Sequence, residues 1–208
     1  MKYIVKRLAF ICKRCNNHIV NCNTAFKITE DVCGPYINKF NMGFYCPSCN
    51  DFTLHYMVDV DISKSISLMN QLGYRTVYSC AGHYKEDTHS CSTPYIMVKG
   101  NKAPYPNLVY DLVKAGFTDW SIGQDETHKK VDISKVEDVE ELLKSAIWCF
   151  HWSVHDLQDT EKELKSKYDP NTVIKYMRRY LKRVNKKLNT VLAKHLREPK
   201  LYSEEIEK

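Results

Sequence analysis

The sequence predicts an α+β fold with three parts: a small cysteine-rich unit, a small α/β core and a C-terminal antiparallel helical hairpin. Six of the nine cysteines fall within the first 50 residues, among short β-type runs separated by Asn, Gly and Pro. The middle of the chain alternates between strand-like and helical apolar spacing, and the spacing beyond residue 134 is helical throughout. The expected boundaries are 1–52 for the cysteine-rich unit, 53–134 for the core, 135–198 for the hairpin and 199–208 for a flexible tail.

The strands and the first helix follow from local spacing. Short strands are expected over residues 2–11, 25–28 and 43–45. Leu54, Tyr56 and Val58 alternate with polar residues and predict a half-buried strand over 53–60. The next helix is expected to begin at an Asp61 cap and to end at Gly73.

The remaining core elements are shorter. We expect strands at 74–78 and 95–98, a polar loop at 79–93, a helix from 107 to 115 closed by Gly116, and a β-hairpin joining 117–122 to 128–133. Beyond them, two amphipathic helices separated by a break at 167–170 carry apolar stripes at three- and four-residue steps. The first of these helices contains Trp148, His151, Trp152 and His155. We interpret them as packing tryptophans and solvated histidines, although an i, i+4 histidine pair is close enough to share a metal.

The composition is that of a folded globular protein, with 43% hydrophobic and 27% charged residues. The apolar run at residues 8–12 is too short for a signal sequence or a membrane span. We therefore expect a cytoplasmic protein with no membrane partner, whose cysteines are metal ligands and not disulfides. The sequence has no glycine-rich phosphate loop and no GxSxG, HExxH or GxGxxG motif, so kinases, serine hydrolases and dehydrogenases are poorly supported.

Two CxxC motifs are the strongest chemical signal. Cys12 and Cys15 form the first motif, and Cys46 and Cys49 form the second. Each motif places two thiolates on one side of a tight turn, and two such turns provide the four sulfur ligands of a structural Zn²⁺ site with no open position. The pattern resembles the zinc ribbon. Four unrelated buried or redox-active thiols are the alternative, and Cys22 and Cys33, which lie between the motifs, are expected either to substitute for a ligand or to pack.

The segment 76–83, Thr-Val-Tyr-Ser-Cys-Ala-Gly-His, predicts a strand that ends in a binding loop. Ser79, Cys80 and Gly82 match the SSCSGR signature of the wybutosine-synthesis methyltransferases, a family that modifies a guanosine in tRNA and uses S-adenosylmethionine. The chain resembles that family over residues 61–100, but Tyr78, Ala81 and His83 replace its Ser, Ser and Arg. The resemblance implies a related fold and loop position, not methyl transfer.

The same loop offers a second set of possible metal ligands. Cys80, His83, His89 and Cys91 have the spacing Cx2Hx5HxC, and a loop can bring such residues together around a transition metal. With one position open to water, the metal would support hydrolysis, and Glu86 or Asp87 would then be the candidate base. The alternatives are a ligand-binding loop without metal, with Ser79 and Gly82 at its start, or a loop whose cysteine packs and whose other residues are solvated.

A basic face on the last helix is the main candidate for a polyanion contact. It consists of Lys175, Arg178, Arg179, Lys182, Arg183, Lys186 and Lys187, with Tyr176 and Tyr180 among them. Cations at helical spacing can follow a phosphate backbone, and the tyrosines can stack on unpaired bases. The alternative is a solvated face, partly neutralised by the acidic residues at 137–141.

The sequence therefore favours a Zn²⁺-containing protein that binds nucleic acid or a nucleotide, with the Ser79–His83 loop as ligand site and the last helix on phosphates. The first alternative is a protein-interaction module, such as an inhibitor or regulator encoded by a mobile element, with Trp148 and Trp152 as exposed anchors. The second is an enzyme that modifies RNA or nucleotides at the Cys80 and His83 loop. No catalytic residue is assigned.

Overall fold

A computed structural model describes residues 3–29, 41–84, 91–99, 106–119 and 147–197. They form two four-stranded antiparallel sheets and a short two-stranded ladder. The first sheet has the order β2-β1-β4-β3 and contains β1 (Tyr3–Cys12), β2 (Ile19–Thr29), β3 (Asn41–Cys46) and β4 (Asp51–Asp59). The second has the order β5-β8-β10-β9 and contains β5 (Arg75–Cys80), β8 (Tyr95–Lys99), β10 (Ile147–Trp152) and β9 (Phe117–Asp119). The ladder joins β6 (His83–Tyr84) to β7 (Cys91–Ser92).

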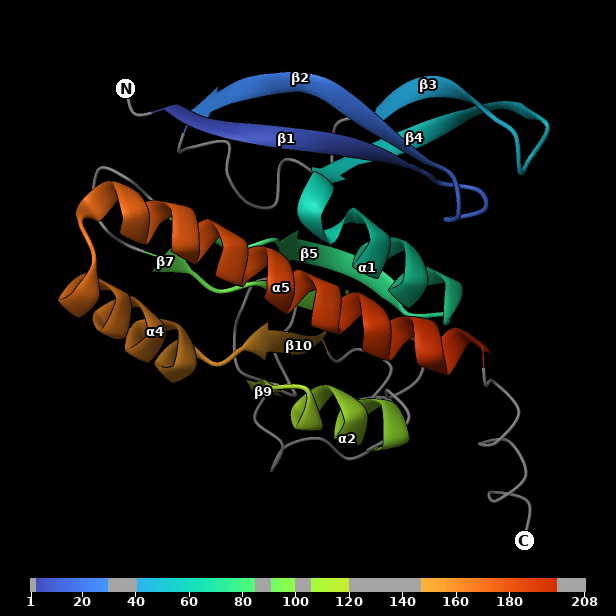
Figure 1. The fold of residues 1–208 in the computed structure, drawn as a ribbon. Coiled ribbons are helices and arrows are strands. Elements are labelled where there is room, and N and C mark those ends of the chain that lie inside the picture. Colours follow the sequence, from blue (N-terminus) through green and yellow to red (C-terminus); the bar gives the residue numbers. More distant parts are fainter. Residues whose placement is uncertain (1–2, 30–40, 85–90, 100–105, 120–146, 198–208) are drawn as a thin grey trace, which may run out of the picture.

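Within the described segments, four helices pack around these sheets. They are α1 (Val60–Gln71), α2 (Pro106–Lys114), α4 (Val154–Lys167) and α5 (Pro170–Arg197). Figure 1 shows the β1–β4 sheet along one side of the molecule, with α1 and α5 side by side over the second sheet and α4 returning beside α5. The α+β class and the helical hairpin, formed by α4 and α5, agree with the sequence prediction. None of the helices in the described segments is long and apolar enough to cross a membrane.

Helix α1 connects the two sheets through one continuous apolar cluster. Ile11 of β1 and Val58 of β4 belong to the same buried cluster as Ile66 of α1, Ile96 of β8 and Leu188 of α5. Because α1 is covered on most sides, three of its serines are buried, and each of their hydroxyls donates a hydrogen bond. Ser63 donates to the Val60 carbonyl, Ser65 to the Asn189 side chain and Ser67 to the Asn16 carbonyl.

The prediction of a helix across residues 147–152 is wrong, because this segment forms the strand β10. It lies between β8 and β9 in the second sheet, and the register pairs Phe150 with Ile96. Trp148 and Trp152 are 6% and 5% exposed, so they are core residues and not exposed anchors. His151 lies on β10 and His155 on α4, so the two do not share a helix face. The expected helix positions 136–146 lie outside the described residues.

Three smaller differences concern the first half of the chain. The cap of α1 is Asp59, whereas Asp61 lies in its first turn. On β4, Leu54 is 56% exposed while His55 is fully buried, so the predicted apolar face is outward at the start of that strand. β4 pairs with both β1 and β3, so the first sheet continues past residue 52. Of the hairpin predicted at 117–133, β9 is described and pairs with β10, and the remainder lies outside the described residues.

The C-terminal end of α5 is attached to α2 through one carboxylate. Asp111 Oδ2 accepts hydrogen bonds from Lys194 Nζ at 2.9 Å and from His195 Nε2 at 3.0 Å. The Lys194 hydrogen bond lowers the pKa of Asp111 below its ordinary value of 3.8, although burial opposes the shift, and the His195 bond lowers it further. Because the carboxylate form is favoured in the folded state, this contact stabilises the fold above pH 3.8 and is lost as the pH falls through the lowered pKa.

Asp111→Asn is expected to reduce the free energy of unfolding by about 1–2 kcal/mol at pH 7, since it removes a charged hydrogen-bond acceptor from a half-buried position. Urea titrations of both proteins at pH 7 and at pH 3 measure the effect. The difference should shrink at pH 3, because the ion pair loses its stabilising effect as the pH approaches the lowered pKa. An equal difference at both pH values would show that the ion pair is not its source.

Candidate metal centre

Two similar turns lie at one end of the first sheet and bring the CxxC motifs together. β1 ends at Cys12 and β3 ends at Cys46, and each turn contains the second cysteine of its motif. An asparagine follows each motif, and both adopt positive φ: 54° at Asn16 and 49° at Asn50. Asparagine tolerates this left-handed conformation better than most residues, so the repeated CxxCN pattern favours two equivalent turns. The asparagine after each motif is a second sequence signal for these turns, in addition to the cysteine spacing.

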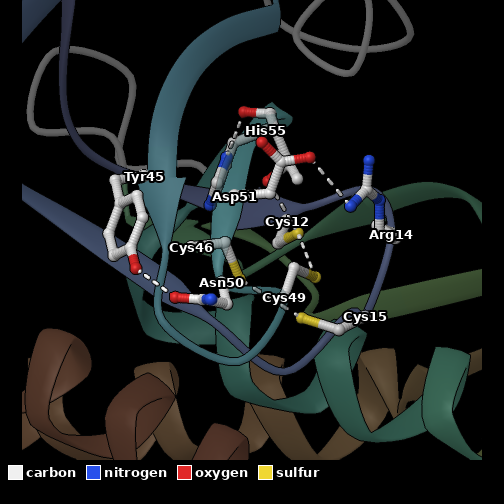
Figure 2. A network of polar contacts seen from close by, with 10 residues as sticks. Cys12, Arg14, Cys15, Tyr45, Cys46, Cys49, Asn50, Asp51 and His55 are labelled. Carbon is white, nitrogen blue, oxygen red and sulfur yellow. Dashed lines mark hydrogen bonds and ion pairs between the residues drawn. The ribbon is translucent and has the colours of Figure 1, made fainter.

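The four sulfur atoms have the separations expected of a tetrahedral metal site. The ligand atoms of Cys12, Cys15, Cys46 and Cys49 all lie within 4.8 Å of one another. Cys12 Sγ lies 3.9 Å from Cys49 Sγ, and Cys15 Sγ lies 3.6 Å from Cys46 Sγ. A tetrahedron with Zn–S bonds of about 2.3 Å has edges of about 3.8 Å. Figure 2 shows the four sulfurs pointing toward one another from the two turns. These four cysteines could therefore hold a metal ion.

The surroundings shift the pKa values of three of these thiols, one downward and two upward. Burial raises the pKa of Cys12, but hydrogen bonds from the Thr53 hydroxyl and from nearby backbone amides outweigh it and lower the pKa to about 6. Burial and the neighbouring sulfurs raise the pKa of Cys49 to about 12, and burial also raises that of Cys46. Without metal, these two thiols are protonated at neutral pH. Because metal binds thiolates, binding must release protons and weaken as the pH falls.

A polar network continues from the sulfurs into the sheet. Thr53 Oγ1 lies 3.1 Å from Cys12 Sγ, and the Thr53 carbonyl lies 3.0 Å from His55 Nδ1. The other nitrogen of His55 lies 3.0 Å from His18 Nδ1. Burial and the charge of His55 lower the pKa of His18, which favours a neutral His18 ring in this contact. Thr53 and His55 on β4, and His18 directly before β2, were not identified as site residues from the sequence, because their contacts form only when the two hairpins pair.

The turns are also braced from outside. Arg14 Nη1 lies 3.1 Å from Asp51 Oδ2 and joins the first turn to the start of β4, and Tyr45 donates to Asn50 Oδ1 at 2.7 Å (Figure 2). Both contacts are exposed, so each adds little stability by itself. The Arg14–Asp51 pair connects the two hairpins, whereas the Tyr45–Asn50 bond lies within the β3–β4 hairpin and holds the second turn.

Asn16 connects the four-cysteine centre to α1. Its carbonyl accepts hydrogen bonds from Ser67 and from Gln71, and its side-chain oxygen accepts from Tyr56 at 3.4 Å. Gln71 in turn donates to the Ser67 hydroxyl at 2.9 Å. The first turn is therefore held by the helix at the centre of the molecule, and a change in this turn is expected to reach α1.

Cys22 lies half-buried on β2 and is not in the four-thiol group, and Cys33 lies outside the described residues. Cys80 ends β5, and His83 begins β6 after the turn at Ala81 and Gly82. These two approach Asp59 of β4, and the three form a second group of possible metal ligands.

The other residues of the predicted loop are placed in part. Ser79 is half-buried on β5, opposite Ile96. Cys91 lies on β7 with its backbone opposite Tyr84, and Glu86, Asp87 and His89 lie outside the described residues. Burial raises the pKa of Cys80, but its hydrogen bond to His83 and the charge of that ring outweigh it, so the pKa is lowered. Asp59 was read from sequence only as a polar position in the predicted strand over 53–60, and its proximity to Cys80 depends on the tertiary fold.

The basic face predicted on α5 is present in the structure. The seven side chains are all exposed: Lys175, Arg178, Arg179, Lys182, Arg183, Lys186 and Lys187. The buried stripe on the other side of the helix includes Val173, Met177, Leu181 and Leu188. On α4, Glu161 pairs with Lys165 and Glu163 with Lys167. These carboxylates are thus engaged within their own helix, and the acidic residues at 137–141 lie outside the described residues.

Comparison with known proteins does not assign a function to this site. No protein-family model matches the chain, and neither a curated protein nor a solved structure is significantly similar to it.

Proposed function

We propose that the chain is a zinc-containing nucleic-acid-binding protein, in which Zn²⁺ at the four-cysteine centre organises the first sheet and α5 contacts phosphates. The observation that carries the second part is a surface pocket of about 330 Å³ lined by Asn171, Ile174, Lys175, Arg178 and Arg179. Three cations and an amide donor around one depression have the chemistry of a phosphate site.

Aromatic rings beside this pocket favour a single-stranded nucleic acid over other polyanions. The Tyr176 ring lies beside Tyr168 with centroids 5.1 Å apart, and Arg179 lies 6.0 Å from the Tyr176 centroid. Tyr168 is 45% exposed. Nucleic-acid grooves combine cations that follow the backbone with aromatic rings on which bases stack. Farther along α5, the exposed cations at 182–187 extend the same face by more than one helical turn.

Zinc fits the first centre because four thiolates in tetrahedral arrangement are the ligand set of structural zinc sites. All four positions are taken by the chain, so this ion would have an architectural role. The two turns that it would hold belong to different hairpins, β1–β2 and β3–β4, and the ion would therefore tie the first sheet together at one end.

The test is a titration of labelled single-stranded RNA and DNA, followed by fluorescence anisotropy at several salt concentrations. We expect Lys175→Glu/Arg178→Glu/Arg179→Glu to lower the affinity at least about tenfold and to reduce the salt slope by about 2, since each single-strand phosphate contributes about 0.7. The control is Lys64→Glu/Arg75→Glu/Lys114→Glu, which changes the net charge equally at exposed positions on α1, β5 and α2. A wild-type affinity that is independent of salt, or equal losses in both variants, would contradict the proposal.

An exposed apolar patch on the outer face of β3 and β4 favours a protein partner as the second candidate. Phe52 is 76% exposed, Leu54 56% and Tyr45 48%, and the Tyr45 and Phe52 rings lie 5.7 Å apart. Such patches commonly mark interaction sites. Phe52→Ser in the same titration separates the two uses. Unchanged nucleic-acid affinity would favour a protein as the partner of this patch, whereas reduced affinity would indicate that a base stacks on Phe52.

A further inference from the structure

A second group of metal-type ligands lies where the two sheets approach each other. Asp59 is the last residue of β4, Cys80 is the last residue of β5, and His83 is the first residue of β6. One ligand atom from each residue lies within 4.8 Å of the other two. We propose that Asp59, Cys80 and His83 bind a second zinc ion and leave one coordination position for water or a small ligand.

The spacing between the carboxylate and the imidazole fits metal ligation better than a direct hydrogen bond. His83 Nε2 lies 3.4 Å from Asp59 Oδ2. An N–H···O hydrogen bond is usually about 2.7–3.2 Å long. Tetrahedral zinc with bonds of about 2.0–2.1 Å to N and O separates those two ligands by about 3.3–3.4 Å. The donor set of one thiolate, one imidazole and one carboxylate also selects a transition metal over Mg²⁺ or Ca²⁺.

The turn after Cys80 repeats a feature of the four-cysteine centre. Gly82 N donates to Cys80 Sγ at 3.4 Å, as Asn17 N donates to Cys15 Sγ at 3.4 Å. In both turns, the amide two residues after a cysteine points at its sulfur. A hydrogen bond of this kind stabilises the thiolate, which is the form that binds metal.

Contacts outside the ligand set hold this turn in place. Ala81 N donates to Asp59 Oδ2 at 3.4 Å, and the Ala81 carbonyl accepts from Asn185 Nδ2 of α5 at 2.8 Å. Gly82 has φ +77°, and a Cβ at that position would lie 2.8 Å from Pro94 and 2.9 Å from Leu181. β4, α5 and the residue preceding β8 thus fix the separation of the ligands before any ion binds, which is how supporting contacts serve metal sites.

Access to the group is restricted. The side chain of Asp59 is 8% exposed and that of His83 is 24% exposed, but the His83 Nε2 atom is itself buried, and Cys80 is half-buried. Three protein ligands are typical of zinc sites that keep a position for an exogenous ligand, whereas structural sites are closed by four protein ligands. This second ion would therefore differ from the first in its ability to exchange a ligand.

The experiment measures zinc per chain by elemental analysis after saturation of the full-length protein and gel filtration. Asp59→Asn and His83→Gln are each expected to contain one equivalent less than the wild type. The amide oxygen introduced by Asp59→Asn would still be able to accept from Ala81 N. This substitution therefore removes the carboxylate ligand and keeps the hydrogen bond that holds the turn. Cys22→Ser is the matched control, because this half-buried cysteine belongs to neither group, and it should keep the wild-type content. The result is the difference in zinc per chain between the wild type and each variant, so it does not depend on the occupancy of the four-cysteine centre.

Two measurements on the wild type keep the proposal testable if the variants fold poorly. Co²⁺ should bind in two steps, and azide should change the visible spectrum of one of the two cobalt ions, because that ion keeps an open position. Zn²⁺ should also protect Cys80 from alkylation by iodoacetamide, as read by mass spectrometry. Binding that saturates at one equivalent, unchanged zinc content in both variants, or Cys80 alkylation that zinc does not slow would each overturn the proposal.

Discussion

Serine in place of Cys49 is expected to abolish metal binding at the four-cysteine centre and to unfold the β1–β4 sheet. A structural zinc ion contributes an apparent binding free energy of about 10–16 kcal/mol, comparable with or larger than the whole stability of a typical domain, about 5–15 kcal/mol. That end of the sheet contains protonatable thiols and a buried polar network around Thr53 and His55 in place of an apolar core. Without the ion, little else would hold the two turns together. The hydrogen bonds of Asn16 to α1 should weaken with the turn.

Amide hydrogen exchange of the full chain measures this effect residue by residue. Protection should disappear over 3–29 and 41–59 in Cys49→Ser, and in the wild type after metal removal with a strong chelator. Cys22→Ser is the control, since both cysteines are half-buried and differ in that only Cys49 belongs to the four-thiol group. Wild-type protection across β1–β4 in Cys49→Ser would show that the sheet does not need the ion.

Acid should reproduce the loss without any substitution. Metal-free Cys46 and Cys49 hold their protons at neutral pH because their pKa values are raised, whereas the metal-bound cysteines are thiolates. Protons therefore compete with zinc, and the apparent zinc affinity falls with each step to lower pH. At a fixed zinc concentration the unfolding midpoint of the first sheet should fall in parallel.

The four-cysteine cluster was predictable because its signal is local. CxxC turns place their sulfurs by short-range geometry, so residue spacing is sufficient to pair Cys12 with Cys15 and Cys46 with Cys49. The amphipathic period of α5 is local in the same sense, and it predicted both the buried stripe and the basic face. The positive φ of Asn16 is local in the same way, because it follows from the turn that contains this residue.

Strand β10 was not predictable in this way, because its apolar residues fit both periods. Phe150 and Val154 continue a helical step, while Trp148, Phe150 and Trp152 fit alternation. Pairing with β8, about fifty residues earlier, decides in favour of the strand, and single-sequence spacing contains no trace of that pairing. Asp59 is a similar case: only the approach of β5 and β6 to the end of β4 turns a residue next to a helix into a possible ligand.

Gly116→Ala is expected to reduce the free energy of unfolding by about 3–5 kcal/mol, because it combines backbone strain with overlap in the core. Gly116 follows α2 with φ +101°, which an alanine adopts only with strain. An added Cβ would lie 2.6 Å and 2.7 Å from two ring carbons of Trp152 on β10. That ring has little freedom to move, since Phe117 packs edge-on against it and its Nε1 donates to Tyr180 at 2.8 Å.

The matched control is Gly43→Ala, since Gly43 is an exposed strand glycine with no atom within 4 Å of an added Cβ and should change stability by less than about 1 kcal/mol. Urea unfolding followed by tryptophan fluorescence gives both values and also reports on Trp152 itself. Because the clash pushes β10 away from α2, Gly116→Ala should also shift the native emission, which Gly43→Ala should leave unchanged. If both variants unfold at the same urea concentration as the wild type, then Gly116 and Trp152 do not pack as closely as the structure shows.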